Sequence, residues 1–217
     1  MPNQKENQTE LAAALFHTIG GAVPHPYELE GRARQLTQEL GDQTHVLLKV
    51  VELCSPPVTP PQLYLSTKAY SWLGGRYSGQ AAKCAAAYLA TDGWTDLPRK
   101  TVGEDGIPVN GAAASRASIV ADLAAAEQAL GKSEASVSHY LEAYRLEPYR
   151  AMFAIKAADS MVSLGRREEA LTFLRGQRQN RYYTPVKYKD AQGNMARNDT
   201  FRELLNAHIL KLEAAVS

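Results

Sequence analysis

The chain has 217 residues, 24 of them basic and 23 acidic, and its formal net charge is +1. A chain of this length buries roughly 70% of its unfolded surface, so its fold needs no disulfide or metal for support. The near-zero net charge excludes a whole-protein electrostatic field that would attract nucleic acid or an anionic membrane.

The two cysteines, Cys54 and Cys84, lie in apolar, helical-looking stretches. This placement predicts buried free thiols in a reducing compartment, with a disulfide or a reactive thiol as the alternative. The apolar run at residues 11–16 is too short for a signal peptide, and no stretch approaches the ~18 apolar residues that span a bilayer. We therefore expect a cytoplasmic protein without membrane contact.

Residues 1–57 form the first predicted unit, an N-terminal helical segment. Its last helix carries an apolar face that consists of Val46, Leu47, Val50, Val51 and Cys54. The stretch Thr59-Pro60-Pro61-Gln62 then predicts the start of another helix, because it fits a capping box with proline in the first turn.

Residues 58–180 read as helical hairpins, since apolar residues recur at spacings of three and four rather than two. Residues 91–114 differ, because they hold the turn dipeptides Asp92-Gly93, Asp105-Gly106 and Asn110-Gly111 and two prolines. We expect an irregular inserted loop there, followed by helical hairpins at 115–147 and 149–178.

Residues 181–217 form the last predicted unit, an extended arm with a turn at Gly193-Asn194 and a C-terminal capping helix. That helix begins at a second capping box, residues 200–203. Its predicted apolar stripe consists of Leu204, Leu205, His208, Ile209 and Leu212. The three units make one continuous domain.

Two glycines, Gly131 and Gly165, each lie between an apolar segment and a second helical segment. Their spacing of ~34 residues is the length of a two-helix repeat. Small and large apolar residues recur around them in a fixed order: Ala124, Ser136, Tyr140 and Ala143 in the first unit, which Pro148 closes, and Ala158, Ala170 and Leu174 in the second. The second unit departs from the pattern, because Gln177 stands at its last alanine position and its closing proline is absent. This pattern resembles the tetratricopeptide repeat (TPR) family. The alternative is a generic helical bundle.

The resemblance implies an all-α fold of antiparallel helical hairpins, stacked as a short superhelix with a concave face. It also implies an earlier unit around residues 62–89, with one or two extra residues in its turn. The insertion at 91–114 then separates the first unit from the second.

The resemblance places one side of the first helix of each hairpin on the concave face. In the two clear units these positions are Ser118, Ala121, Asp122, Ala125 and Gln128, then Met152, Ile155, Lys156, Asp159 and Val162. Some family members grip a partner's C-terminal carboxylate there with Lys, Asn and Arg. Only Lys156 fits that clamp, and Asp159 stands where Asn is wanted. We therefore expect a protein or peptide partner held without a carboxylate clamp, unless the protein's own terminal helices fill the groove.

The arm that follows is basic and aromatic, with no acid between residues 170 and 189. Its basic residues are Arg175, Arg178, Arg181, Lys187 and Lys189, and its tyrosines are Tyr182, Tyr183 and Tyr188. Such a segment caps the end of a repeat stack, contacts a protein partner or a second copy, or stacks nucleic-acid bases. The cap is the favoured interpretation, and nucleic acid is the least favoured.

No catalytic or metal-binding motif stands out. The five histidines form neither HxxxH nor HExxH, and the glycine pairs lack the context of a phosphate-binding loop. The sequence thus predicts a non-enzymatic scaffold without cofactor or metal. The predicted contact surface comprises Gln128, Met152, Ile155, Lys156, Asp159, Arg181, Tyr182 and Tyr183. The alternatives are a nucleic-acid-associated regulator that uses residues 175–189, and an enzyme whose site lies between Trp94, Asp96, Arg99 and the groove.

Overall fold

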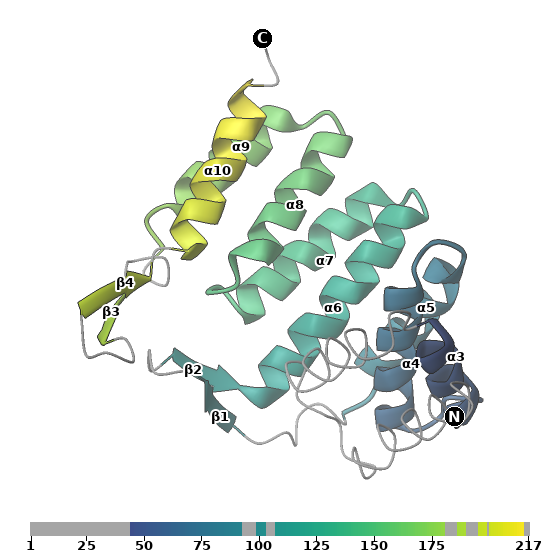
Figure 1. The fold of residues 1–217 in the computed structure, drawn as a ribbon. Coiled ribbons are helices and arrows are strands. Elements are labelled where there is room, and N and C mark those ends of the chain that lie inside the picture. Colours follow the sequence, from purple (N-terminus) through teal and green to yellow (C-terminus); the bar gives the residue numbers. More distant parts are fainter. Residues whose placement is uncertain are drawn as a thin grey trace, which may run out of the picture.

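The computed structural model describes residues 44–92, 99–102, 107–180, 186–189, 195–198 and 200–214. Within these ranges the chain is mainly helical, with two short β-hairpins (Figure 1). The helices are α3 (Thr44–Leu53), α4 (Pro60–Leu73), α5 (Ser78–Leu89), α6 (Gly111–Ala129), α7 (Ser133–Leu146), α8 (Ala151–Ser163), α9 (Arg167–Gln177) and α10 (Thr200–Ala214). The 3-10 turn η1 (Gly75–Tyr77) joins α4 to α5. The predicted all-α class is confirmed.

The start of α4 shows how local sequence fixes an element. Proline occupies the first helical positions, where no intrahelical N–H bond is lost. The side chain of Gln62 accepts a hydrogen bond of 3.1 Å from the backbone N–H of Thr59. This bond is one half of the predicted capping box.

Three antiparallel helix pairs follow one another along the chain and lie side by side in Figure 1. We call them hairpin 1 (α4–α5), hairpin 2 (α6–α7) and hairpin 3 (α8–α9). Hairpins 2 and 3 turn at Gly131 and Gly165, whose φ angles are 75° and 76°. Glycine adopts this left-handed conformation without steric cost, which allows the chain to reverse in a short turn.

Helix contacts within and between the hairpins confirm the repeat. Ala124, Ser136 and Ala143 of hairpin 2 are fully buried, as are Ala158, Ala170 and Leu174 of hairpin 3. The ring of Tyr140 packs between Ala124 and Ala157, so it fills the seam between the two hairpins. The described helices therefore have a TPR-like arrangement.

Hairpin 1 matches the predicted earlier unit. Its turn spans residues 74–77, one residue more than the turns at 130–132 and 164–166. Tyr88 on α5 is fully buried and meets Tyr64 of α4 edge to face, with ring centroids 5.6 Å apart. Leu47, Val50 and Cys54, at the end of the N-terminal unit, pack into the same cluster. Residues 1–43 of that unit lie outside the described residues.

Helix α10 covers hairpin 3, as the predicted capping helix should. Leu205, Ile209 and Leu212 are buried against the core of hairpins 2 and 3. Leu204 was predicted on the same stripe, but 42% of it is exposed. The buried residues follow the spacing i, i+4, i+7, which turns position 204 away from hairpin 3.

The insertion differs from the predicted irregular loop, and the predicted extended arm contains paired strands. The insertion contains an antiparallel hairpin of β1 (Arg99–Val102) and β2 (Ile107–Asn110), and α6 begins directly after it at Gly111. Asn-Gly marks a turn, yet Asn is also favoured just before a helix, and tertiary context selected the helix start here. The predicted extended arm contains β3 (Val186–Lys189) and β4 (Met195–Asn198), which pair antiparallel. The predicted turn at 193–194 lies outside the described residues.

Candidate partner-binding surface

The predicted concave-face residues lie on α6 and α8, the first helices of hairpins 2 and 3. We define the inner face by five of them: Asp122, Gln128, Met152, Lys156 and Asp159. Positions 122 and 156 are separated by the same repeat length as the two turn glycines, so they are equivalent places in hairpins 2 and 3. Helix α10 packs beside α8 and continues the row (Figure 1).

Lys68 ties hairpin 1 to hairpin 2 on this face. Only 5% of the residue is exposed. Its Nζ lies 2.6 Å from Oδ2 of Asp122 and also donates to the hydroxyl of Ser118. A buried ammonium needs such a partner, because its desolvation is costly. No repeat position in the sequence marked Lys68 for this contact, because the register of the first repeat is ambiguous.

The other predicted polar residues also bridge neighbouring helices. Gln128 Nε2 donates to the hydroxyl of Ser163 at 3.0 Å, which joins the ends of α6 and α8. Asp159 Oδ1 lies 2.9 Å from Nε2 of His208, a contact that joins α8 to α10. Only 12% of the His208 side chain is exposed, so this member of the predicted apolar stripe is mostly buried, beside Asp159.

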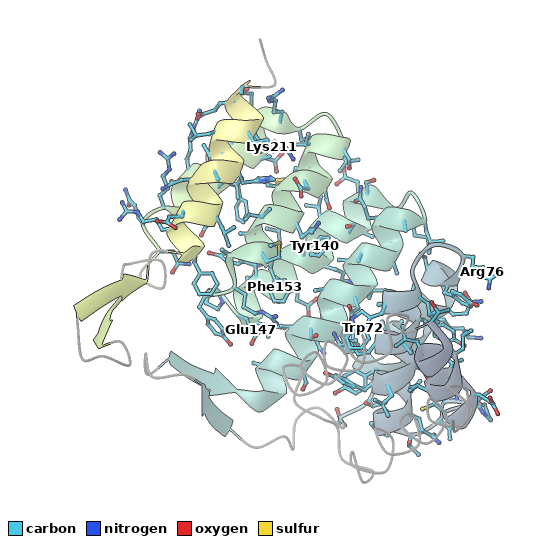
Figure 2. All side chains as sticks on the ribbon, viewed as in Figure 1. Trp72, Arg76, Tyr140, Glu147, Phe153 and Lys211 are labelled. Carbon is cyan, nitrogen blue, oxygen red and sulfur yellow. The ribbon has the colours of Figure 1, made fainter. Side chains whose placement is uncertain are left out.

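The phenol of Tyr140 is influenced electrostatically by the carboxylates of both Asp122 and Asp159. Burial, and then the negative charges of Asp122 and Asp159, raise the pKa of its phenol to about 12. Both acids therefore act on the same hydroxyl, which stays protonated at neutral pH. Figure 2 shows Tyr140 in the middle of the helical stack.

The remaining inner-face residues divide by exposure. Met152 is 48% exposed, which is unusual for a large apolar side chain, and Lys156 is also exposed. Ile155 was predicted to face a partner, but it is only 7% exposed and packs in the core. The accessible part of this face therefore includes Met152, Lys156 and the carboxylate of Asp159, whose side chain is 43% exposed.

The basic-aromatic arm is described only in part. Arg181, Tyr182 and Tyr183 lie outside the described residues. Arg175 Nη2 lies 2.7 Å from Oε1 of Glu213, so one of the arm's five basic residues is neutralised by α10.

The described residues hold little that suggests catalysis. No cluster of His, Cys, Asp and Glu among them is arranged to hold a metal ion. Both cysteines are free and buried, and burial raises the pKa of the Cys54 thiol to about 11. Trp94 and Asp96 lie outside the described part of the chain. The described helices include none that is long and apolar enough to cross a membrane.

Comparisons with known proteins add one structural likeness. No protein-family model matches the sequence, and no curated protein does. The chain is similar to a solved structure of a putative kinesin light chain from Podospora anserina, described as having nearly identical TPR-like repeats. The identity is 15%, the TM-score is 0.46, and the match covers 100% of this chain and 99% of that one. The TPR-like fold is seen independently in the three hairpins, their glycine turns and the buried small residues of their seams.

Proposed function

We propose that the protein is a non-enzymatic scaffold that holds a protein or peptide partner on its inner face. The observation that carries this proposal is the exposure of Met152 beside Lys156 on α8, the first helix of hairpin 3. An exposed methionine adapts its shape to an apolar partner, and its burial contributes about 1.5–3 kcal/mol.

The paired polar groups support a binding role. Lys68–Asp122, Gln128–Ser163 and Asp159–His208 hold four helices in register. A surface whose helices are fixed before binding loses less conformational entropy when a partner docks. The partner then meets a preformed surface.

The chemistry of the face indicates the kind of partner. Lys156 provides one exposed positive charge, and the partly exposed carboxylate of Asp159 lies beside His208. A partner with an apolar residue for Met152 and an acidic group for Lys156 fits this arrangement. We place the protein in the reducing cytoplasm, in keeping with its two free cysteines.

The test compares two double variants in affinity capture and then in direct binding to the captured partner. The double variant Met152→Ala with Lys156→Ala removes two exposed side chains of the inner face. Leu130→Ala with Arg145→Ala is the matched control, since it removes a similarly exposed apolar side chain and an exposed basic one from elsewhere.

We expect the inner-face variant to bind the partner at least about tenfold more weakly than the wild type, because two contacts of about 1 kcal/mol or more are lost. The control should bind as the wild type does. Equal binding by all three proteins would contradict the proposal.

A further inference from the structure

The turn of each hairpin places a basic residue directly after a glycine of positive φ. The pairs are Gly75-Arg76, Gly131-Lys132 and Gly165-Arg166. The repeat thus presents a cation at the same end of every hairpin. The surroundings of this cation differ between hairpins.

In hairpin 3 the cation is neutralised. Arg166 donates two hydrogen bonds to Glu169, of 2.6 and 2.8 Å, and a third of 2.8 Å to Glu134 of hairpin 2. Its guanidinium is therefore occupied by two carboxylates. It holds adjacent hairpins together and has little left to offer a partner.

In hairpin 1 the cation is held by an aromatic ring instead. The guanidinium of Arg76 lies 4.9 Å from the ring centroid of Tyr77, and its Nη2 is 2.9 Å from the Tyr77 hydroxyl. Tyr77 in turn stacks on Tyr70, with centroids 5.8 Å apart and an interplanar angle of 27°. In the described part of the chain no carboxylate pairs with Arg76. Figure 2 shows it at the outer edge of the stack.

The sequence around this turn leaves the positive charge uncompensated. Residues 53–91 contain Lys68, Arg76 and Lys83 and no acidic residue. Lys68 is buried against Asp122, whereas Arg76 and Lys83 are exposed. Hairpin 1 therefore presents two exposed cations, one of them on a tyrosine stack.

We propose that Tyr70, Arg76 and Tyr77 form a second docking surface, the turn platform, and that its occupant is an acidic peptide segment of a partner protein. Stacking fixes the guanidinium while several of its N–H groups remain available to bind a carboxylate in the bidentate manner. Tyrosine and arginine are among the residues that most often dominate protein interfaces. The platform lies at a hairpin turn, apart from Met152 and Lys156. Whether a peptide binds there is therefore independent of whether a partner binds the inner face.

A peptide is favoured over nucleic acid for two reasons. The whole chain has a net charge of only +1, so it lacks the extended positive field that phosphate backbones require. The platform also offers one stacked guanidinium, which matches one carboxylate better than a row of phosphates. Nucleic acid is therefore treated as a competing outcome.

The experiment is a titration of the full-length, isotope-labelled protein followed by NMR at low salt. The probe is a synthetic peptide of alternating Glu and Ser, with an alternating Gln and Ser peptide and an oligothymidylate as comparisons. We expect shifts of the Gly75 and Tyr77 amides and of the Arg76 side-chain Nε–H with the Glu peptide alone.

Three variants make the result specific. Arg76→Ala should lower the affinity for the Glu peptide about tenfold, which is the loss expected for a charge-assisted contact. Tyr77→Leu should weaken it about threefold, because the cation–π support is removed while the charge stays. Arg166→Ala is the matched control and should leave the affinity unchanged. Circular dichroism checks that each exposed-site variant remains folded.

The outcomes that would overturn the proposal are distinct. No shift at the turn, or an equal loss from Arg76→Ala and Arg166→Ala, would show that no platform exists. Preference for the oligothymidylate through Arg76 would replace the peptide with nucleic acid. Loss of binding in the Met152 and Lys156 variant alone would assign the peptide to the inner face instead.

Discussion

Residues 60–89 of hairpin 1 contain three basic residues and no acid, whereas residues 151–177 of hairpin 3 contain four basic and three acidic residues. Hairpin 3 uses its own Glu169 to pair Arg166. In hairpin 1, Lys68 pairs with Asp122 of α6, which belongs to hairpin 2. Two units with the same helical geometry thus obtain their electrostatic balance in different ways.

This difference shows how a repeat stack assigns roles to its units. A unit with balanced charge is stabilised locally and by its neighbours. A unit with unbalanced charge depends on the next unit for its buried cation and keeps its exposed cations for other contacts.

Lys68→Ala should lower the free energy of unfolding by about 3 kcal/mol, because it breaks a mostly buried ion pair by removing one of the two charges. Urea unfolding measures the loss. Arg175→Ala, which breaks the exposed pair with Glu213, should cost less than about 1 kcal/mol. The double change Lys68→Met and Asp122→Leu should recover most of the stability. If Lys68→Ala and Arg175→Ala lowered the free energy of unfolding by the same amount, the proposed difference between the buried and the exposed ion pair would be wrong.

Gly74→Ala in hairpin 1 should destabilise more than Gly165→Ala in hairpin 3. Gly74 has φ 60° and ψ −165°, a region that only glycine readily occupies, which predicts a cost of about 2 kcal/mol. Gly165 has φ 76° and open space where a methyl group would be added, which predicts about 1 kcal/mol from the backbone alone. Thermal and urea midpoints both measure the order, and a reversed order would contradict the geometry of the two turns.

Alkaline pH should weaken the hairpin 1 side through Cys54, which packs there. Burial raises its pKa from 9.0 to about 11, so the folded state favours the neutral thiol. The stabilisation is complete below pH 9 and is lost as the pH rises through 11. The urea midpoint of the wild type should therefore fall more steeply over this range than that of Cys54→Ala. Parallel pH profiles would show that the thiol does not contribute.

The smallest effects concern the two turn arginines. Arg166→Ala should lower the urea midpoint slightly at low salt and not at high salt, since exposed ion pairs are weak and screened. Arg76→Ala should leave the midpoint unchanged at both salt concentrations, because no carboxylate in the described ranges depends on it. A larger loss for Arg76→Ala than for Arg166→Ala would make the turn platform a structural element rather than a docking surface.

Local signals determined much of the fold. The capping box at Thr59, the glycines at 131 and 165, and the buried small residues each act through neighbours within a few residues or one repeat. These features predicted the helices, their turns and the stacking of hairpins 2 and 3. The same signals failed at Asn110-Gly111, where turn and helix start share one composition.

The sequence predicted which side of each helix carries the candidate site, but not which residues on that side are exposed. The repeat spacing identified Met152 and Lys156 as surface positions, and both are exposed. It did not separate them from Ile155, because burial on a curved stack depends on how closely the next helix approaches.

The sequence by itself determined that this chain forms stacked helical hairpins, since helix periodicity, caps and turn glycines are properties of short segments. Only the tertiary structure decided which charges are satisfied. Lys68 of α4 meets Asp122 of α6, and Asp159 of α8 meets His208 of α10. Arg76 and Arg166 occupy equivalent turns in the sequence, yet one rests on a tyrosine ring and the other between two glutamates. The contacts of Lys68 with Asp122, of Asp159 with His208 and of Arg166 with Glu134 follow from the approach of separate helices in space, which no local pattern encodes. The contacts of Arg76 with Tyr77 and of Arg166 with Glu169, by contrast, join near neighbours in the chain.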